Sequence, residues 1–347
     1  MRSDRAPRSS EIRPPAALVV FVVLLVGIPR GASAGAIRDN LYGVKALGGS
    51  EAWAVGNFGS IYHTTDAGRT WEARESGTKA PLFGVDFADD RHGWAVGKSA
   101  LILATHDGGT SWKAQKSPIP PEKHLFNVHA VDARTVWAVG DWGAITVTHD
   151  GGETWEDRSL SDDVVLYDLS FPDAEHGFIA GEFGTLLATS DGGGAWEKRD
   201  VGTDQTLFGV AFASPATGWA VGIDGLILRT TDAGRSWSIQ RGRARAEALE
   251  DLGFMEMVKN PGLYAVQVVG RYGVVCGDTG VLLTTADGGE TWTPRELPEK
   301  EKLVWMRAVS LAPGGHGVVV GAEGFSLGID QDRIAAPDAR RAAPPAS

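Results

Sequence analysis

The stretch THDGGTSW, Thr105–Trp112, is written almost letter for letter six times in this chain of 347 residues. The other copies are TTDAGRTW, THDGGETW, TSDGGGAW, TTDAGRSW and TADGGETW, which end at Trp71, Trp155, Trp196, Trp237 and Trp292. An enzyme needs a reactive group once, in one place, whereas a motif that recurs about every 41 residues indicates a repeated structural unit. The copies therefore predict architecture before they predict chemistry.

The repeated unit is seen most fully in LFGVDFADDRHGWAVGKSALILATHDGGTSW, Leu82–Trp112. It divides into four short β segments separated by turn residues: LFGVDF, GWAVG, LILAT and the residues from the tryptophan onward. The glycine that ends the second segment recurs at intervals of 41, 43, 41, 41, 55 and 44 residues, at Gly56, Gly97, Gly140, Gly181, Gly222, Gly277 and Gly321. Seven units of four strands predict an all-β fold, a seven-bladed β-propeller with four-stranded blades.

The repeated aspartate and tryptophan have a structural explanation. In T-x-D-G-G-x-x-W the aspartate can accept hydrogen bonds from N–H groups of its own turn, and the glycines adopt backbone conformations that other residues resist. The tryptophan buries a large aromatic surface between neighbouring sheets, so its replacement by alanine should cost about 3–5 kcal/mol. We interpret all six pairs as structural residues and not as catalytic carboxylates or calcium ligands: Asp66 and Trp71, Asp107 and Trp112, Asp150 and Trp155, Asp191 and Trp196, Asp232 and Trp237, and Asp287 and Trp292.

The N-terminal residues have the composition of an export signal. Arginines precede an apolar run at Ala16–Ile28, and Ala32-Ser33-Ala34 matches an A-x-A cleavage site. Residues 1–34 are therefore predicted to be a signal peptide that is cleaved after Ala34, which places the protein on the periplasmic or lumenal side of a membrane. A retained N-terminal anchor is the alternative.

The remaining chain is assigned to a propeller at residues 35–333 and a disordered tail at residues 334–347, which is rich in Ala, Pro and Arg. The seventh unit lacks the D-x-G-x-x-W ending and has no recognisable fourth strand. We therefore predict that Ala36–Asp39 supplies this strand, so that an N-terminal strand closes the ring and removes exposed sheet edges.

Net charge excludes one class of partner. The formal charge of the chain is −11, and residues 1–34 carry five Arg against one Asp and one Glu, so removal of their charge of +3 leaves about −14. Nucleic-acid binding requires clustered Lys and Arg, and an acidic chain has no general attraction to anionic lipid. Cys276 stands alone at a strand position where other units have Val, which indicates a small buried hydrophobe.

The T-x-D-G-G-x-x-W turn is similar to the Asp-box, or BNR repeat, of sialidases and related propellers. Together with GWAVG and LFGV, it makes the unit resemble the photosystem II stability/assembly factor family across nearly all of residues 41–330. The resemblance implies an exported, non-catalytic propeller that holds a membrane subunit during assembly. It implies a photosystem II subunit as partner if the host is photosynthetic, and otherwise another integral membrane protein, such as a transporter. We expect a monomer without a cofactor or a metal ion.

The turns between the second and third strands vary from unit to unit, as a recognition surface does. Three of them carry an aromatic residue that the β framework does not require, and two of these aromatics follow an acid. We predict that these residues bind a partner: Phe58, Asp141, Trp142, Glu182 and Phe183. The alternative is that the aromatics only cover the hairpins beneath them.

Two further departures from the repeat add arginines to the candidate site. An insertion at Arg241–Gly262 contains Arg241, Arg243 and Arg245, which suit a partner that bears carboxylates, and its middle is predicted to be helical. The alternative for the insertion is a solvated surface excursion. Arg307 replaces the aromatic residue of the first strand in unit seven, close to the expected central channel, where it could bind an anion or a C-terminal carboxylate. Its alternative role is an ion pair with a neighbouring acid.

Catalysis finds little support in the sequence. A sialidase needs three arginines around a carboxylate and usually contains an F-R-I-P sequence, which is absent here. The histidines lack the spacing of a metal site, and neither a G-x-S-x-G turn nor a Walker loop is present. An Asp-box glycoside hydrolase or glycan-binding propeller, and a permanent accessory subunit of a membrane complex, remain the competing functions.

Overall fold

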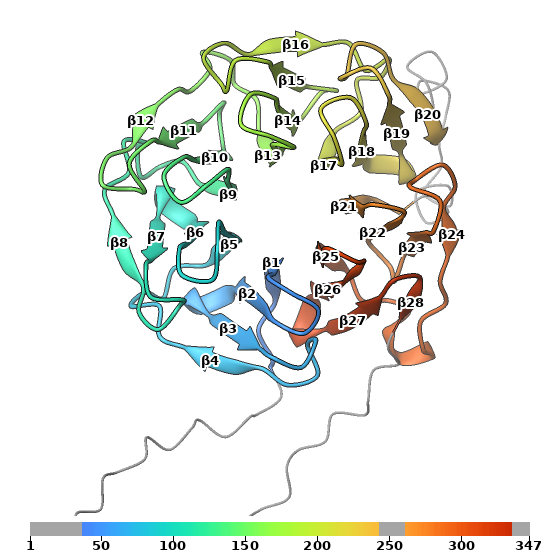
Figure 1. Cartoon of the computed structure of the whole chain (residues 1–347), viewed down its shortest axis with the longest axis horizontal. Helices are drawn as coiled ribbons and strands as arrows, with labels where there is room; N and C mark the ends of the chain where they lie inside the picture. The colour runs from blue at the N-terminus through green and yellow to red at the C-terminus, as the bar shows by residue number, and fades with distance from the viewer. Residues whose placement is uncertain (1–36, 243–260, 335–347) are drawn as a thin grey trace, which may run out of the picture. The chain divides into compact units, whose positions relative to one another are not determined.

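The computed structural model describes residues 37–242 and 261–334. These residues form seven antiparallel sheets of four strands each, arranged as blades around a central axis (Figure 1). The seven-bladed propeller predicted from the repeats is therefore confirmed. The predicted signal peptide, the predicted helix of the insertion, Arg243 and Arg245 lie outside the described residues.

Each blade runs from its innermost to its outermost strand in chain order. The innermost strands are β1 (Leu41–Ala46), β5 (Leu82–Phe87), β9 (Leu125–Ala130), β13 (Leu166–Ser170), β17 (Leu207–Phe212), β21 (Leu263–Val269) and β25 (Met306–Ala312). The second strands are β2 (Ala52–Gly56), β6 (Gly93–Gly97), β10 (Val136–Gly140), β14 (Gly177–Gly181), β18 (Gly218–Gly222), β22 (Tyr272–Gly277) and β26 (His316–Gly321). The third strands are β3 (Ile61–Thr64), β7 (Ile102–Thr105), β11 (Ile145–Thr148), β15 (Leu186–Thr189), β19 (Ile227–Thr230), β23 (Leu282–Thr285) and β27 (Ser326–Asp330). The outermost strands are β4 (Glu72–Arg74), β8 (Lys113–Gln115), β12 (Glu156–Asp157), β16 (Glu197–Arg199), β20 (Ser238–Arg241), β24 (Thr293–Pro294) and β28 (Arg333–Ile334).

The hydrophobic core lies between neighbouring blades. Because each second strand is covered by a blade on either side, a segment such as GWAVG is apolar throughout and fully buried. Between the first two blades, Trp53 of β2 packs against Phe87 of β5 and against Trp112, which precedes β8, with ring centroids 5.3 and 6.1 Å apart. The two repeated aromatic positions thus bind one blade to the next.

The repeated turn between the third and fourth strands follows one hydrogen-bonding scheme. Asp107 Oδ1 accepts a hydrogen bond from the N–H of Ser111 at 2.9 Å, and Asp107 Oδ2 accepts one from its hydroxyl at 2.6 Å. Thr105 Oγ1 donates to Asp107 at 2.8 Å and accepts from the N–H of Gly109 at 2.8 Å. The hydrogen bonds that Asp107 accepts, above all the one from the Ser111 hydroxyl, lower the pKa of Asp107 to about 2.

The structure corrects the prediction of ring closure. The fourth strand of blade seven is β28, which pairs with β27 through Asp330 and Arg333, so Ala36–Asp39 does not supply it. The chain reverses through a short turn in which Gln331 adopts a left-handed φ of 63°. Glycine usually occupies such a position, so the sequence gives no sign of this turn. The N-terminal residues still contact this blade, because the N–H of Gly324 donates to the carbonyl of Asp39 at 2.8 Å.

Direct contacts between the first and last blades close the ring. The N–H of Ala46 in β1 donates to Oγ of Ser310 in β25 at 2.9 Å. Trp71 Nε1 donates to Oγ of Ser326 at 3.2 Å, and the same hydroxyl donates to the carbonyl of Gly68 at 2.8 Å. Blades one and seven are thus joined near the axis and again near the rim.

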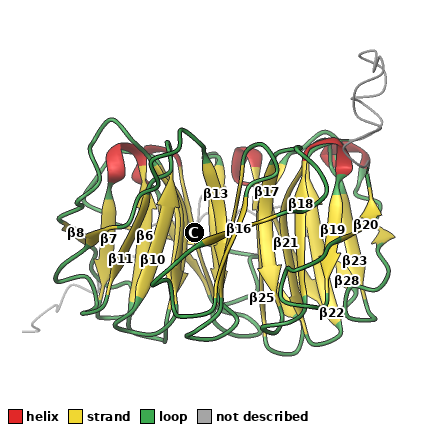
Figure 2. Cartoon of the chain, turned by 90° about the horizontal axis from the view of Figure 1, so that it is seen from above, coloured by secondary structure: helices red, strands yellow, loops and turns green. Residues whose placement is uncertain are grey.

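One face of the propeller carries both the hairpins between second and third strands and the links between blades (Figure 2). The 3₁₀ turns η1 (Asn57–Gly59), η2 (Lys98–Ala100), η3 (Ile223–Gly225) and η6 (Ala322–Gly324) are four of these hairpins, and η5 (Glu299–Glu301) lies in a link. Backbone hydrogen bonds join the hairpins to the links. For example, the N–H of Lys98 donates to the carbonyl of Pro81 at 3.0 Å. We call this surface the hairpin face.

Candidate functional site

Three aromatic side chains project from the hairpin face. Phe58, Trp142 and Phe183 are 73%, 49% and 67% exposed, and each occupies the same position in its hairpin. Their φ angles are 57°, 49° and 55°, which lie in the left-handed region that bulky residues rarely adopt. The equivalent residues of the other hairpins, among them Ser99 and Glu323, adopt the same conformation, so the turn requires the φ but not an aromatic side chain. Because Phe58, Trp142 and Phe183 are nevertheless large, apolar and exposed, they are candidates for a binding role.

The two predicted acids of this face are also bound to the links between blades. Asp141 Oδ2 accepts a hydrogen bond from the N–H of His124 at 3.0 Å, and Glu182 Oε2 accepts one from the N–H of Val165 at 3.1 Å. Both carboxylates therefore hold the ends of the links that precede blades three and four. This structural role keeps each acid next to the exposed aromatic that follows it.

A ring of six aromatic side chains and Arg307 lines the axis. These residues hold the second position of the seven innermost strands: Tyr42, Phe83, Phe126, Tyr167, Phe208, Tyr264 and Arg307. In every blade the pairing with the second strand skips this position, as between the pairs Leu41–Gly56 and Gly43–Val55. The skipped residue is a β-bulge, which turns its side chain out of the sheet and toward the axis.

Neighbouring side chains of this ring are in contact around the axis. Centroids of successive aromatic rings lie 5.6, 5.6, 5.9, 5.1 and 5.5 Å apart from Tyr42 to Tyr264, and the Arg307 guanidinium lies 5.2 Å from the Tyr264 ring centre. Tyr42 also stacks on Trp305, with centroids 6.0 Å apart. We call the seven residues at the second position of the innermost strands, Arg307 included, the aromatic collar.

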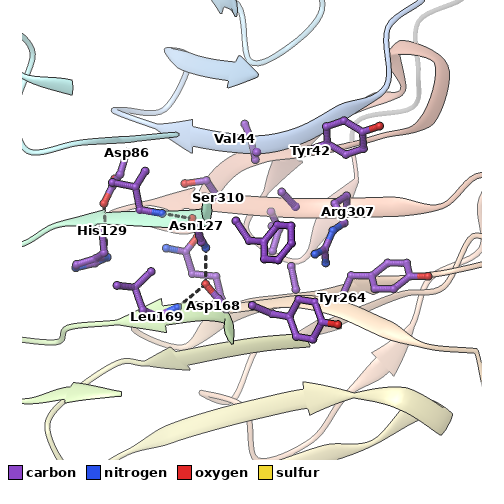
Figure 3. A pocket seen from close by; sticks show the side chains of 18 of the residues that line it. Tyr42, Val44, Asp86, Asn127, His129, Asp168, Leu169, Tyr264, Arg307 and Ser310 are labelled. Atoms are coloured by element: carbon purple, nitrogen blue, oxygen red, sulfur yellow. Dashed lines mark hydrogen bonds and ion pairs between the residues drawn. The ribbon is translucent and has the colours of Figure 1, made fainter. Parts of the chain in front are cut away.

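The collar borders an axial cavity of about 400 Å³ that all seven innermost strands line (Figure 3). Asp168 faces this cavity and accepts hydrogen bonds from the N–H groups of Val210 and Leu169 at 2.8 and 2.9 Å and from Asn127 Nδ2 at 2.5 Å. Burial raises the pKa of Asp168 to about 6, although these bonds and Arg307 act in the opposite direction.

A second polar layer of the cavity holds blades together. Lys45 Nζ lies 2.5 Å from Asp86 Oδ1, and His129 Nδ1 lies 3.5 Å from Asp86 Oδ2, which also accepts the N–H of Ala130 at 2.9 Å. Burial disfavours the Asp86 carboxylate, but Lys45 and His129 outweigh burial and lower its pKa. Side chains at the same strand position join three other blade pairs in this way, by accepting a backbone N–H of the next blade: Ser170, Gln267 and Ser310.

Sequence reasoning missed this layer and the role of Asp168. The available signal was the polar character of the third and fifth positions of the innermost strands, where a fully apolar core would have no reason for Asp86, Asp168 or Gln267. Each of these acceptors meets a donor from the following blade. The sequence pattern of one repeat therefore cannot show which donor of the next blade each acceptor binds.

The described residues give no support for a cysteine nucleophile, a metal site or a membrane-spanning helix. Cys276 is fully buried, and burial raises the pKa of its thiol to about 12, so this residue is not an activated nucleophile. Within residues 37–242 and 261–334, no group of three or more His, Cys, Asp or Glu side chains has the arrangement of a metal site. In the same part of the chain, no helix is long and apolar enough to span a membrane.

Fold and site together define a seven-bladed β-propeller whose variable residues gather on one face and around the axis. The sequence profile of the family described as Photosynthesis system II assembly factor YCF48 matches residues 74–164, 159–241 and 195–301. These matches overlap and cover residues 74–301, so the chain belongs to this family. The resemblance stated from the repeats is thereby confirmed.

Solved structures with the same fold include members of this family. YCF48 bound to a D1 peptide is 21% identical with a TM-score of 0.66, covering 85% of this chain and 93% of that chain. YCF48 from Cyanidioschyzon merolae is 20% identical with a TM-score of 0.65, covering 86% and 97%. The GH74 xyloglucanase from Xanthomonas campestris is 16% identical with a TM-score of 0.65, covering 86% of this chain and 53% of that chain. Likenesses at these identities show the fold alone, and the comparison with curated proteins gives no match.

Proposed function

We propose that this protein is an exported, non-catalytic scaffold that binds a subunit of a membrane complex through its hairpin face. The observation that carries the proposal is the set of three exposed aromatics on this face, Phe58, Trp142 and Phe183. Large aromatic side chains are enriched among the residues that dominate binding energy in protein interfaces. Membership of the YCF48 assembly-factor family supports a binding role.

The partner is proposed from the family and from the chemistry of the face. The solved relative binds a D1 peptide, and we propose a photosystem II subunit as the partner in a photosynthetic host. In another host, the same scaffold serves a different integral membrane protein, such as a transporter. Exposed aromatics that neighbour Asp141 and Glu182 suit an apolar segment flanked by basic residues.

A pull-down from the host's membranes tests this proposal. The tagged protein is incubated with membranes in mild detergent, and captured proteins are identified by mass spectrometry. We expect recovery of an integral membrane subunit, with at least tenfold less recovered by the variant Trp142→Ala/Phe183→Ala, because each aromatic of an interface hot spot contributes about 2 kcal/mol. Ile239→Ala is the matched control, since Ile239 is an exposed apolar residue of the outer strand β20.

The possible outcomes separate the competing functions. Association with precursor complexes alone supports an assembly factor, whereas constant stoichiometry with the mature complex indicates a permanent subunit. Recovery of nothing above a tagged control, with the protein free in the periplasm, would contradict the scaffold, and hydrolysis of glycan substrates would then be measured. Export itself is tested by the mass of the purified protein, which is expected to begin at Gly35.

A further inference from the structure

The aromatic collar follows a pairing rule that blade seven breaks. Tyr42 donates its hydroxyl hydrogen to Oδ1 of Asn57, the first residue of its own hairpin, at 3.0 Å. Tyr167 and Tyr264 interact in the same way with the first hairpin residues of their blades, Glu182 and Asp278. Every tyrosine of the collar therefore has an acceptor above it.

In blade seven both members of the pair differ. Arg307 replaces the aromatic residue, and Ala322 begins the hairpin, so the cation has no acceptor at that position. Among the described residues, no carboxylate lies within 4.0 Å of the Arg307 guanidinium. Arg307 therefore does not form the alternative ion pair with an acid of this part of the chain. A guanidinium carries five N–H donors in a rigid fork, and leaving them without acceptors is unfavourable.

The surroundings make Arg307 available to a ligand. Its side chain is half-buried and points into the cavity, and its charge faces the ring of Tyr264 (Figure 3). Asp168 is the acid that favours the charged form of Arg307 most, but its oxygens already accept hydrogen bonds from Val210, Leu169 and Asn127. The fork of Arg307 thus remains open toward the axis.

We infer that the axial cavity binds a carboxylate on Arg307, with the apolar group next to that carboxylate enclosed by the aromatic collar. A guanidinium binds a carboxylate with two parallel hydrogen bonds, and a cavity of about 400 Å³ is large enough for one terminal residue of a peptide or for a small organic acid. Asp168 also lines the cavity, and its negative charge opposes a dianion such as phosphate more strongly than a carboxylate with a single charge. This inference goes beyond the proposed function, since it concerns the axis and not the exposed aromatics of the hairpin face.

Calorimetric titration with matched acids and amides tests the inference. The probes are N-acetyl-L-phenylalanine and its amide, and the peptide acetyl-Gly-Gly-Gly-Leu-Phe with a free or an amidated C-terminus. We expect the free acids to bind at least about tenfold more tightly than the amides, the ratio that one charge-assisted bidentate contact provides. Preference for the peptide acid assigns the site to a C-terminal tail, whereas equal binding of both acids assigns it to a small carboxylate.

Two variants make the result specific to Arg307. Arg307→Tyr places an aromatic residue at this position, as in the other six blades, three of which have Tyr and three Phe, so the variant is expected to fold. It should abolish the preference for acids over amides. Arg74→Gln is the matched control, because Arg74 lies on the outer strand β4 and pairs with Glu72 at 2.7 Å. Equal binding of acids and amides, no binding of any probe at about 10 mM, or an unchanged preference in Arg307→Tyr would overturn the inference.

Discussion

At Gly109 the repeated turn meets the tryptophan of the preceding blade. A Cβ atom added there would lie 2.1 Å from the Trp53 ring, and φ is +73°. Gly193 and Gly289 stand in the same relation to Trp137 and Trp219. The glycines of the motif are therefore required by close packing between blades as much as by the turn itself.

Replacement of Gly109 by alanine is expected to lower the free energy of unfolding by about 2–4 kcal/mol. Left-handed backbone costs an L-residue about 1 kcal/mol, and overpacking against the buried Trp53 ring adds about 1–3 kcal/mol. Urea unfolding measures the change. Gly202→Ala is the control, because Gly202 has a φ of +76° with no atom within 4 Å of the added Cβ, so only the backbone cost of about 1 kcal/mol should remain.

The aspartates of the repeated turns make stability depend on acid pH. Hydrogen bonds from the hydroxyls of Ser111 and Ser236, and then from their N–H groups, lower the pKa of Asp107 and Asp232 to about 2 from the ordinary 3.8. A carboxyl group whose pKa is lower in the folded state stabilises the fold above its unfolded pKa and loses this contribution as pH falls toward the folded pKa. Unfolding free energy should therefore decrease between about pH 4 and pH 2.

Urea unfolding at a series of acid pH values measures this dependence. The variant Asp107→Asn keeps an oxygen acceptor but no ionisable group, so its stability should fall less steeply over the same range. An identical pH profile for the variant and the parent protein would show that Asp107 does not contribute to acid unfolding.

At the scale of elements, the strands were predictable because each is a local pattern. A fully apolar segment such as GWAVG between glycines indicates a strand covered on both sides, and β6 is buried throughout. The last strand was missed because Asp330–Arg333 reverses the chain without glycine, using Gln331 at a φ of 63°. The bulge that turns the collar toward the axis also lies in the pairing between strands, which a periodicity of two does not reveal.

Ser326 joins blades one and seven at the rim of the ring. Its hydroxyl accepts the Trp71 Nε1 hydrogen at 3.2 Å and donates to the carbonyl of Gly68 at 2.8 Å. Ser326→Ala leaves both groups without this bond and should lower the free energy of unfolding by about 1–3 kcal/mol. Thermal unfolding compared with Ser238→Ala, an exposed serine of β20, measures the effect; equal losses in the two variants would contradict a special role in closure.

At the scale of the whole molecule, residues of the candidate site were predictable where they depart from the repeat. Phe58, Trp142 and Phe183 are exposed on one face, and Arg307 reaches the axis, as their positions in the unit indicate. The partners of the cavity residues were not predictable, because a pair such as Asp168 and Val210 joins side chain and backbone of different blades, 42 residues apart. These pairs depend on which blades are neighbours in the folded ring, and the sequence of a single repeat does not contain that information.

The balance of charge and aromatic surface on the hairpin face leads to a last prediction. The formal charge of the chain is −11, and salt screens attraction between exposed charges, with a Debye length of only about 3–4 Å above roughly 0.5 M. Burial of Phe58, Trp142 and Phe183 does not weaken with added salt. We expect capture of the membrane subunit to persist at roughly 0.5 M sodium chloride, measured by the same pull-down over a salt series. Loss of capture at that concentration would show that Asp141, Glu182 and the other acids of the face supply the affinity, and would remove the aromatics from the centre of the interface.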